Sequence, residues 1–269
     1  MDAPENFDGI DSQISRSSTQ PQDESGTANP EVEQAVEEMF EAVGMAKEAI
    51  LEGKWSSILG ADASGRYPAL IMGHLMKRVY KEKGINQPKQ FFYAGGQQME
   101  KREELLMEYF QKIKPELGDR ALIVTESIHS GKELHDTLRM FRKLGIAADV
   151  LSINSDLYVN LHKHAISENQ DYREQGYKST FSFYEGEVDL EREYPEVNFY
   201  LAKGNLYGDA VGKGSRAQGT GIKGRYDKTK ATSELNPDRS TEEINALRSD
   251  ARTVADKLYA QVFAPNPQT

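Results

Sequence analysis

The spacing of apolar residues along the first half of the chain alternates between two periods. Across residues 30–52 apolar side chains recur every three or four positions, which predicts an amphipathic helix. Asn29 suits its N-cap, Pro30 its first position, and Gly53 ends it. Short apolar runs bounded by loop residues then predict buried parallel strands. These runs are residues 56–60, 90–94, 121–124 and 147–153.

Between the predicted strands the helical period returns. A second helix begins near Pro68, and a third runs through residues 105–113 until Pro115 and Gly118 stop it. A fourth helix ends at Gly145. Because strand and helix alternate, the sequence predicts an α/β fold: a parallel sheet of four or five strands with helices on both faces.

After residue 155 this alternation stops. Residues 181–184 and 197–202 have the character of short strands, and Ser240 with Glu243 forms a capping box that begins a final amphipathic helix. Residues 203–230 hold seven Gly, seven Lys or Arg and two Asp, which predicts an extended basic loop.

Charge is unevenly distributed along the chain. The formal net charge is −10, and residues 1–29 contribute −5 of it from six acids and one base. Because this segment also has very few apolar residues, we expect a disordered acidic tail. An α/β core of residues 30–155 follows, and then a C-terminal extension of residues 156–269 that contains the short strands, the basic Gly-rich loop and the terminal helix.

Composition excludes several classes of site. The chain has no Cys, which rules out disulfides and thiolate zinc sites, and His162 and His164 lack a third metal ligand. It has no apolar stretch of membrane-spanning length or of signal-peptide character, so we expect a cytoplasmic protein with no membrane partner. The acidic balance argues against general nucleic-acid binding. The oligomeric state, including a homo-oligomer, stays open.

Two segments carry most of the candidate chemistry, residues 56–68 and residues 120–133. Each passes from an apolar run through small, polar residues into a helical pattern. Where a strand turns tightly into a helix, exposed backbone N–H groups and the helix dipole hold phosphate, provided that small residues let the anion approach. Ala63, Ser64 and Gly65 meet this requirement in the first segment, and Ser127, Ser130 and Gly131 meet it in the second. Two adjacent loops of this kind would suit a ligand with a phosphate at each end.

The second segment resembles the ribose-phosphate signature of the type I phosphoribosyltransferases. Residues 121–124 match its apolar run, Glu126 its second acid, and residues 130–132 its phosphate-binding turn. Residues 60–68 resemble the pyrophosphate loop of the same family, and the order of the elements also agrees. The resemblance covers residues 30–155 and implies a phosphoribosyltransferase-like fold.

The resemblance also implies a ligand and roles for individual residues. The ligand is phosphoribosyl pyrophosphate, with Mg²⁺ bound through its pyrophosphate, and the reaction transfers ribose 5-phosphate to a nitrogenous acceptor. The backbone of residues 128–132 would hold the 5′-phosphate, Glu126 the ribose hydroxyls, and residues 63–66 the pyrophosphate, while Lys101 and Arg102 would close over the leaving group. The residues expected around the ligand are Asp62, Ala63, Ser64, Gly65, Arg66, Thr125, Ser127, Ile128, His129, Ser130, Gly131, Lys132 and Glu133.

Two positions depart from the family pattern. Thr125 stands where the first acid is expected, and Glu133 where a phosphate-binding Thr is expected. These departures favour a second hypothesis, a catalytically inactive sensor that binds a phosphorylated nucleotide or sugar. A third, an unrelated nucleotide-binding α/β protein, predicts that the two loops are not adjacent.

Several residues keep two interpretations. Asp62 would either bind magnesium through water or orient the loop, or else cap the following helix. His129 would either donate to phosphate or lie solvated in the loop. Residues 212–215 resemble a phosphate loop but lack the preceding strand. Trp55, Phe91 and Tyr93 are expected in the core.

Overall fold

The computed structural model describes residues 30–61, 65–93, 101–128, 131–155, 190–202 and 241–264. Within them, five strands form one parallel sheet in the order β2-β1-β3-β4-β5. The predicted α/β fold is therefore confirmed, with five strands. The strands are β1 (Ser57–Ala61), β2 (Lys89–Tyr93), β3 (Arg120–Ile128), β4 (Ala147–Ser155) and β5 (Phe199–Leu201).

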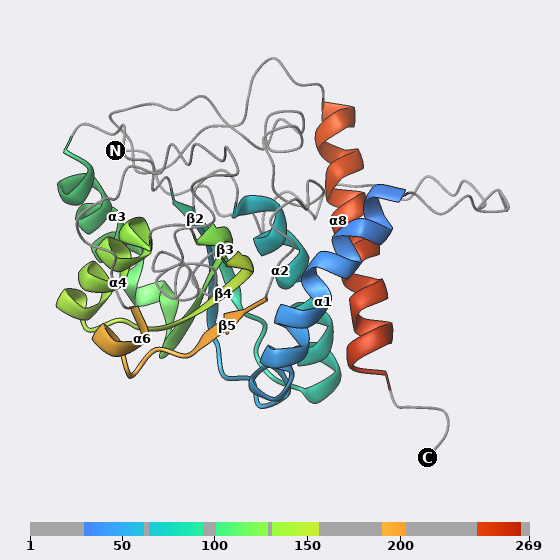
Figure 1. Ribbon diagram of the computed structural model, residues 1–269, viewed down its shortest axis with the longest axis horizontal. Helices are drawn as coiled ribbons and strands as arrows, with labels where there is room; N and C mark the ends of the chain where they lie inside the picture. Colours follow the sequence, from blue (N-terminus) through green and yellow to red (C-terminus); the bar gives the residue numbers. More distant parts are fainter. Residues whose placement is uncertain are drawn as a thin grey trace, which may run out of the picture.

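Helices cover both faces of the sheet (Figure 1). Ile58 of β1 points into the cluster on one face and Leu59 into the cluster on the other, as successive residues of a strand do. Both are fully buried, which explains why the strands have continuous apolar runs. One layer contains α1 (Pro30–Leu51), α2 (Arg66–Lys83) and α8 (Thr241–Val262), and the other contains α3 (Arg102–Leu117), α4 (Lys132–Leu144) and α6 (Leu190–Glu193).

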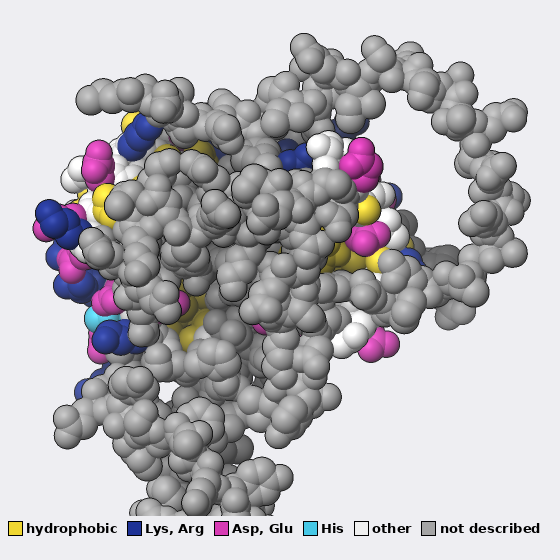
Figure 2. Space-filling model, turned by 90° about the horizontal axis from the view of Figure 1, so that it is seen from above, with side chains coloured by type: hydrophobic (Ala, Val, Ile, Leu, Met, Phe, Trp, Pro, Cys, Tyr) yellow, Lys and Arg dark blue, Asp and Glu magenta, His cyan; other side chains and the backbone are white. Residues whose placement is uncertain are grey.

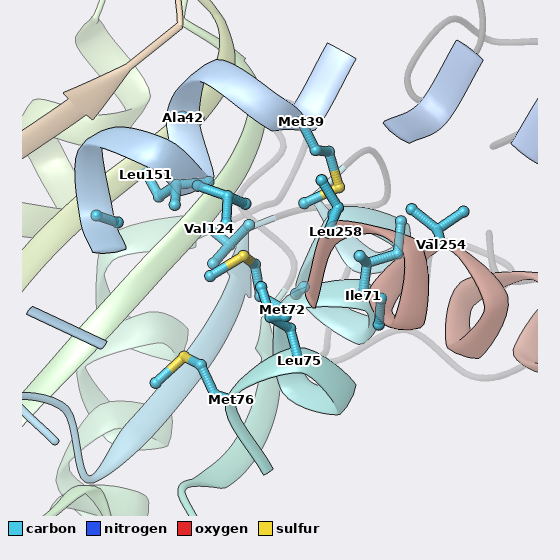
Figure 3. Close-up of a cluster of buried hydrophobic side chains, with 14 of the residues drawn as sticks. Met39, Ala42, Ile71, Met72, Leu75, Met76, Val124, Leu151, Val254 and Leu258 are labelled. Carbon is cyan, nitrogen blue, oxygen red and sulfur yellow. The ribbon is translucent and has the colours of Figure 1, made fainter. Parts of the chain in front are cut away.

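The larger hydrophobic cluster joins the sheet to α1, α2 and α8. Figure 3 shows Met39 of α1, Leu75 of α2 and Leu258 of α8 converging beside Val124 and Leu151 of the sheet. All five side chains are fully buried. Since α8 and β5 come from the predicted C-terminal extension, this part of the chain completes the same core and the same sheet as residues 30–155.

The prediction that Pro115 ends the third helix is wrong. α3 continues through Pro115 to Leu117, and Gly118, with φ of 70°, follows its end. Proline removes one main-chain hydrogen bond from the last turn. Ile113 and Leu117 are nevertheless buried in the cluster beneath α3 and α4, and burial of two large apolar side chains offsets that loss.

Some of the other predictions are confirmed by the structure, and others fall on residues that it does not describe. Trp55 and Tyr93 are buried and Phe91 is half-buried, as expected of core residues. The strand predicted within residues 197–202 is present as β5, three residues long. The predicted acidic tail, the strand at 181–184, the capping box at Ser240, the two histidines His162 and His164, and the basic loop lie outside the described residues.

A buried carboxylate ties together the amino ends of the strands. Asp149 of β4 is fully buried and accepts hydrogen bonds from Trp55 Nε1 at 2.9 Å and from the backbone and side chain of Asn198, each at 2.9 Å. It also pairs with Lys54 at 3.0 Å and Arg120 at 2.5 Å. Burial acts to raise the pKa of Asp149, but hydrogen bonds from Asn198, Lys54 and Trp55 outweigh it and hold the pKa below its ordinary value.

The exposed surface of α3 and α4 carries balanced charge. Figure 2 shows basic and acidic side chains interleaved on the side where these helices lie. Glu103 of α3 binds Arg139 at 2.9 Å and Lys143 at 3.1 Å, both on α4. These pairs keep the pKa of Glu103 below its ordinary value through hydrogen bonds from Lys143 and Arg139.

Candidate functional site

The two segments singled out in the sequence end neighbouring strands of the sheet. β1 lies between β2 and β3, and Gly60 is in register with Val124 of β3. From β1 the chain goes first to β2 on one side and then to β3 on the other. Ligands of such sheets bind at the carboxyl edge where the strand order reverses. That point lies between β1 and β3, the strands that precede the two candidate loops.

Gly65 is wedged between the ends of these two strands. It is the N-cap of α2, and its N–H donates to the Ala61 carbonyl at 3.0 Å. A Cβ atom at Gly65 would lie 2.3 Å from the Ala61 oxygen and 2.6 Å from the Val124 oxygen. Both are backbone atoms that cannot swing aside, so only glycine fits here. The start of α2 therefore contacts β3 directly. Asp62, Ala63 and Ser64 lie outside the described residues.

Gly131 begins the helix that follows β3. It has φ of 71°, a left-handed conformation that favours glycine, and its carbonyl accepts from the His135 N–H at 2.8 Å. Lys132 is exposed and Glu133 is half-buried in the first turn of α4. A carboxylate in a first turn occupies the favourable end of the helix dipole, which is also where a phosphate would sit. His129 and Ser130 lie outside the described residues.

β3 is longer than the sequence predicted. The strand was expected to end at Val124, but it continues to Ile128 because β4 is also long enough to pair with it. Thr125, Ser127 and Ile128 are in register with the last residues of β4. Only residues 129–131 therefore separate the end of β3 from the start of α4 in the sequence.

The extended part of β3 places the ribose-binding candidates at the carboxyl edge. Thr125 and Glu126 are half-buried there, and the Glu126 carbonyl accepts from the Ser152 hydroxyl at 3.4 Å. Ile128 is buried in the cluster beneath α3 and α4. The side chain of Ile128 is therefore taken up by the core, and only its backbone could contact a ligand.

Arg66 is buried at the start of α2. Its side chain belongs to a residue only 6% exposed, and its guanidinium carbon lies 5.3 Å from the centroid of the Phe92 ring. Burial raises the pKa of Tyr109 on α3, and the positive charge of Arg66 acts to lower that pKa. Arg66 is thus the first residue of α2 and lies against Phe92, near the carboxyl end of β2.

The two predicted leaving-group residues lie at the start of α3. Lys101 has φ of 53° and an exposed side chain whose ammonium is 3.9 Å from the Glu104 carboxylate. Arg102 is the first residue of α3. Because α3 follows β2, both residues come after the carboxyl end of that strand, the edge that also bears Arg66.

Sequence reasoning missed two features, one beside Arg66 and one at the opposite edge of the sheet. Phe92 and Tyr109 contact or influence Arg66, yet aromatic residues at apolar positions look like ordinary core residues in a sequence. The Asp149 network at the opposite edge was also missed, although a lone acid inside the apolar run 147–153 is a visible signal. A small cavity of about 40 Å³ lies near that network, between Arg120, Phe141 and Tyr194, and so at the amino edge and away from both loops.

Among the described residues, no group of three or more His, Asp or Glu side chains is arranged to hold a metal ion. None of the described helices is both long and apolar enough to cross a membrane. Comparison with protein-family models, curated proteins and solved structures finds no match to this chain.

Proposed function

We propose that this protein binds phosphoribosyl pyrophosphate, as its magnesium complex, at the carboxyl edge of β1 and β3 and acts as a phosphoribosyltransferase. The observation that supports this most is the position of Gly65, wedged against the ends of both strands. It makes the ends of β1 and β3 contiguous, which a ligand with two anionic ends requires of the loops that follow them.

Each group of residues has a role in this proposal. The backbone at 128–132 holds the 5′-phosphate at the amino end of α4, and Glu126 binds the ribose hydroxyls. The residues before α2 and the Arg66 charge hold the pyrophosphate, and Lys101 and Arg102 close over it as it leaves. Cations and N–H donors at that end lower the barrier because negative charge accumulates on the departing pyrophosphate.

One observation favours a second candidate, a sensor that binds a phosphorylated nucleotide or sugar without turnover. Glu133 lies in the first turn of α4, two residues after Gly131. Its carboxylate competes with a phosphate for the positive end of the same helix dipole. Thr125 also stands where the family has the first acid of its ribose-binding pair, and the two departures together favour binding without turnover.

The experiment that tests both candidates measures binding to the full chain by calorimetry. Phosphoribosyl pyrophosphate with Mg²⁺ should bind more tightly than ribose 5-phosphate or pyrophosphate alone, because one molecule then engages both loops. The two fragments should bind together, and each should compete with the whole ligand. Absence of saturable binding, or mutual exclusion of the two fragments, would contradict the proposal.

Turnover separates the enzyme from the sensor. Pyrophosphate release with a panel of purine and pyrimidine bases supports the transferase, whereas tight binding without release supports the sensor. The double variant Thr125→Asp, Glu133→Thr should raise affinity roughly tenfold by removing the competing carboxylate and restoring the missing acid. Glu52→Gln, which removes one negative charge just before β1, serves as the matched control and should leave affinity unchanged.

A further inference from the structure

Arg66 is buried although its guanidinium is charged at every working pH. The residue is only 6% exposed. Removing such a charge from water is costly unless the protein supplies compensating interactions. The neighbours of Arg66 therefore indicate how this charge is stabilised and oriented.

The first neighbour is the ring of Phe92, near the carboxyl end of β2. The Arg66 guanidinium carbon lies 5.3 Å from its centroid, within the distance at which an arginine is attracted to an aromatic face. Phe92 is in register with Gly60 of β1. The ring thus belongs to the strand next to β1 and lies beneath the start of α2.

Gly60 makes room for this ring. A Cβ atom at Gly60 would lie 2.6 Å from Phe92 Cδ1 and 3.0 Å from Cε1. Any larger residue at this position of β1 would push the ring away from its place. The absence of a side chain lets Phe92 lie across β1, where it reaches Arg66.

Tyr109 of α3 fixes the same strand end from the other side. Its hydroxyl donates to the Phe92 carbonyl at 2.9 Å. Burial raises the pKa of Tyr109, so the hydroxyl keeps its proton and remains a donor. The positive charge of Arg66 acts on Tyr109 in the opposite direction, which is consistent with their proximity.

We infer that Phe92 and Tyr109 are positioning residues that hold the Arg66 guanidinium at the carboxyl edge, aimed at the anionic end of the ligand. The identity of that ligand rests on the proposed function, but the positioning of Arg66 does not. α3 thus contacts the cation at the start of α2 through two interactions. Tyr109 of α3 donates to the Phe92 carbonyl, and the Phe92 ring contacts the Arg66 guanidinium.

Ligand binding tests the role, with magnesium pyrophosphate as the probe and the full chain as the protein. Phe92→Leu should weaken binding about threefold to thirtyfold, the range expected for losing one cation–π contact. Phe92→Tyr retains an aromatic face and should restore binding. Tyr109→Phe should weaken binding about threefold through loss of one hydrogen bond. Phe91→Leu, on the same strand, is the matched control and should leave binding unchanged.

A second measurement needs no ligand. A double-mutant cycle of Arg66→Met and Phe92→Leu, followed by urea unfolding, should show that the two changes are coupled by at least about threefold in the unfolding equilibrium constant. Arg66→Gln, which also removes the cation, replaces Arg66→Met if the latter does not fold.

The outcomes are distinguishable. If the wild-type chain does not bind the probe, the proposed function fails, and the cycle still decides whether Phe92 holds Arg66. Additive effects in the cycle would overturn the inference. So would equal weakening of probe binding by Phe92→Leu and Phe91→Leu, or failure of Phe92→Tyr to restore it.

Discussion

The two edges of the sheet use polar residues in different ways. At the amino edge, donors from Lys54, Trp55, Arg120 and Asn198 converge on one buried carboxylate, that of Asp149. At the carboxyl edge, the described features are glycines at the starts of helices, a cation on an aromatic ring and half-buried side chains near the end of β3. The amino edge is therefore saturated by donors from within the chain, whereas the carboxyl edge is where we propose that the ligand binds.

The residues that stabilise the sheet and the residues that we propose to bind a ligand thus lie at opposite edges. A buried carboxylate with five donors fixes the starts of the strands. With the amino ends held in this way, the residues at the carboxyl ends are not needed to fix the strands. Substitutions at the amino edge should consequently have the larger effects on stability.

The largest effect is expected from Asp149→Ala. It would leave the Lys54 and Arg120 charges and the Trp55 N–H without their shared partner, and should lower the free energy of unfolding by about 3 kcal/mol or more. Urea unfolding monitored by circular dichroism measures this. Asp256→Ala, which removes an exposed partner of Arg78, should cost less than about 1 kcal/mol. Equal costs would remove the distinction drawn for the amino edge.

The next effect concerns a pair of glycines with opposite expected signs. Gly65→Ala forces a Cβ atom against two backbone oxygens and should destabilise the protein by about 1–3 kcal/mol. Gly44→Ala lies on the exposed side of α1 with nothing within 4 Å, and should stabilise it by about 0.5–1 kcal/mol. Thermal unfolding of both variants gives the two signs directly. Tolerance of alanine at residue 65 would contradict the contact of α2 with β3.

A smaller effect is expected in the pH dependence of stability. The pKa of Asp149 is lower in the folded chain than its ordinary value, so its contribution is complete above that value and is lost as pH falls through the folded pKa. Below about pH 4, Asp149→Asn should therefore make the dependence of unfolding free energy on pH shallower, by at most about 1.4 kcal/mol per pH unit. An unchanged slope in acid would show that other carboxylates account for it.

The smallest effect is expected at the surface of α3 and α4. Glu103→Gln removes the exposed ion pairs with Arg139 and Lys143 and should change the free energy of unfolding by no more than about 0.5 kcal/mol. That difference should disappear in 1 M salt, which screens exposed charges. A salt-independent loss larger than this would mean that these pairs contribute to stability as a buried network does.

The fold was largely predictable because its signals are local. Apolar runs bounded by Gly residues defined the strands, and the helical period defined the helices between them. The sequence could not predict the length of β3, since Thr125–Ile128 has the composition of a loop and becomes strand only through pairing with β4. The prediction that Pro115 ends α3 was wrong for a similar reason. Leu117 remains helical because it is buried against residues that are distant in the sequence.

The candidate site also contains residues that local sequence patterns indicate and residues that only the tertiary structure brings together. Gly65 and Gly131 could be selected in advance because tight turns into helices restrict the residue types allowed there, and Arg66 could be selected only through the resemblance to the pyrophosphate loop. Phe92 and Tyr109 could not, because their connection to Arg66 depends on the order of strands in the sheet. The convergence of Trp55, Arg120 and Asn198 on Asp149 also joins residues up to 94 positions apart, a separation that no local pattern reveals.

The place of α8 in the hydrophobic core has a consequence for biosynthesis. Val254 and Leu258 belong to the same buried cluster as Met39 and Ile71, which leave the ribosome far earlier (Figure 3). Until translation has passed residue 262, the nascent α1 and α2 lack the helix that shields their apolar side chains from water. A ribosome that stalls before that point therefore carries a nascent chain with exposed apolar surface, the kind of intermediate that molecular chaperones bind.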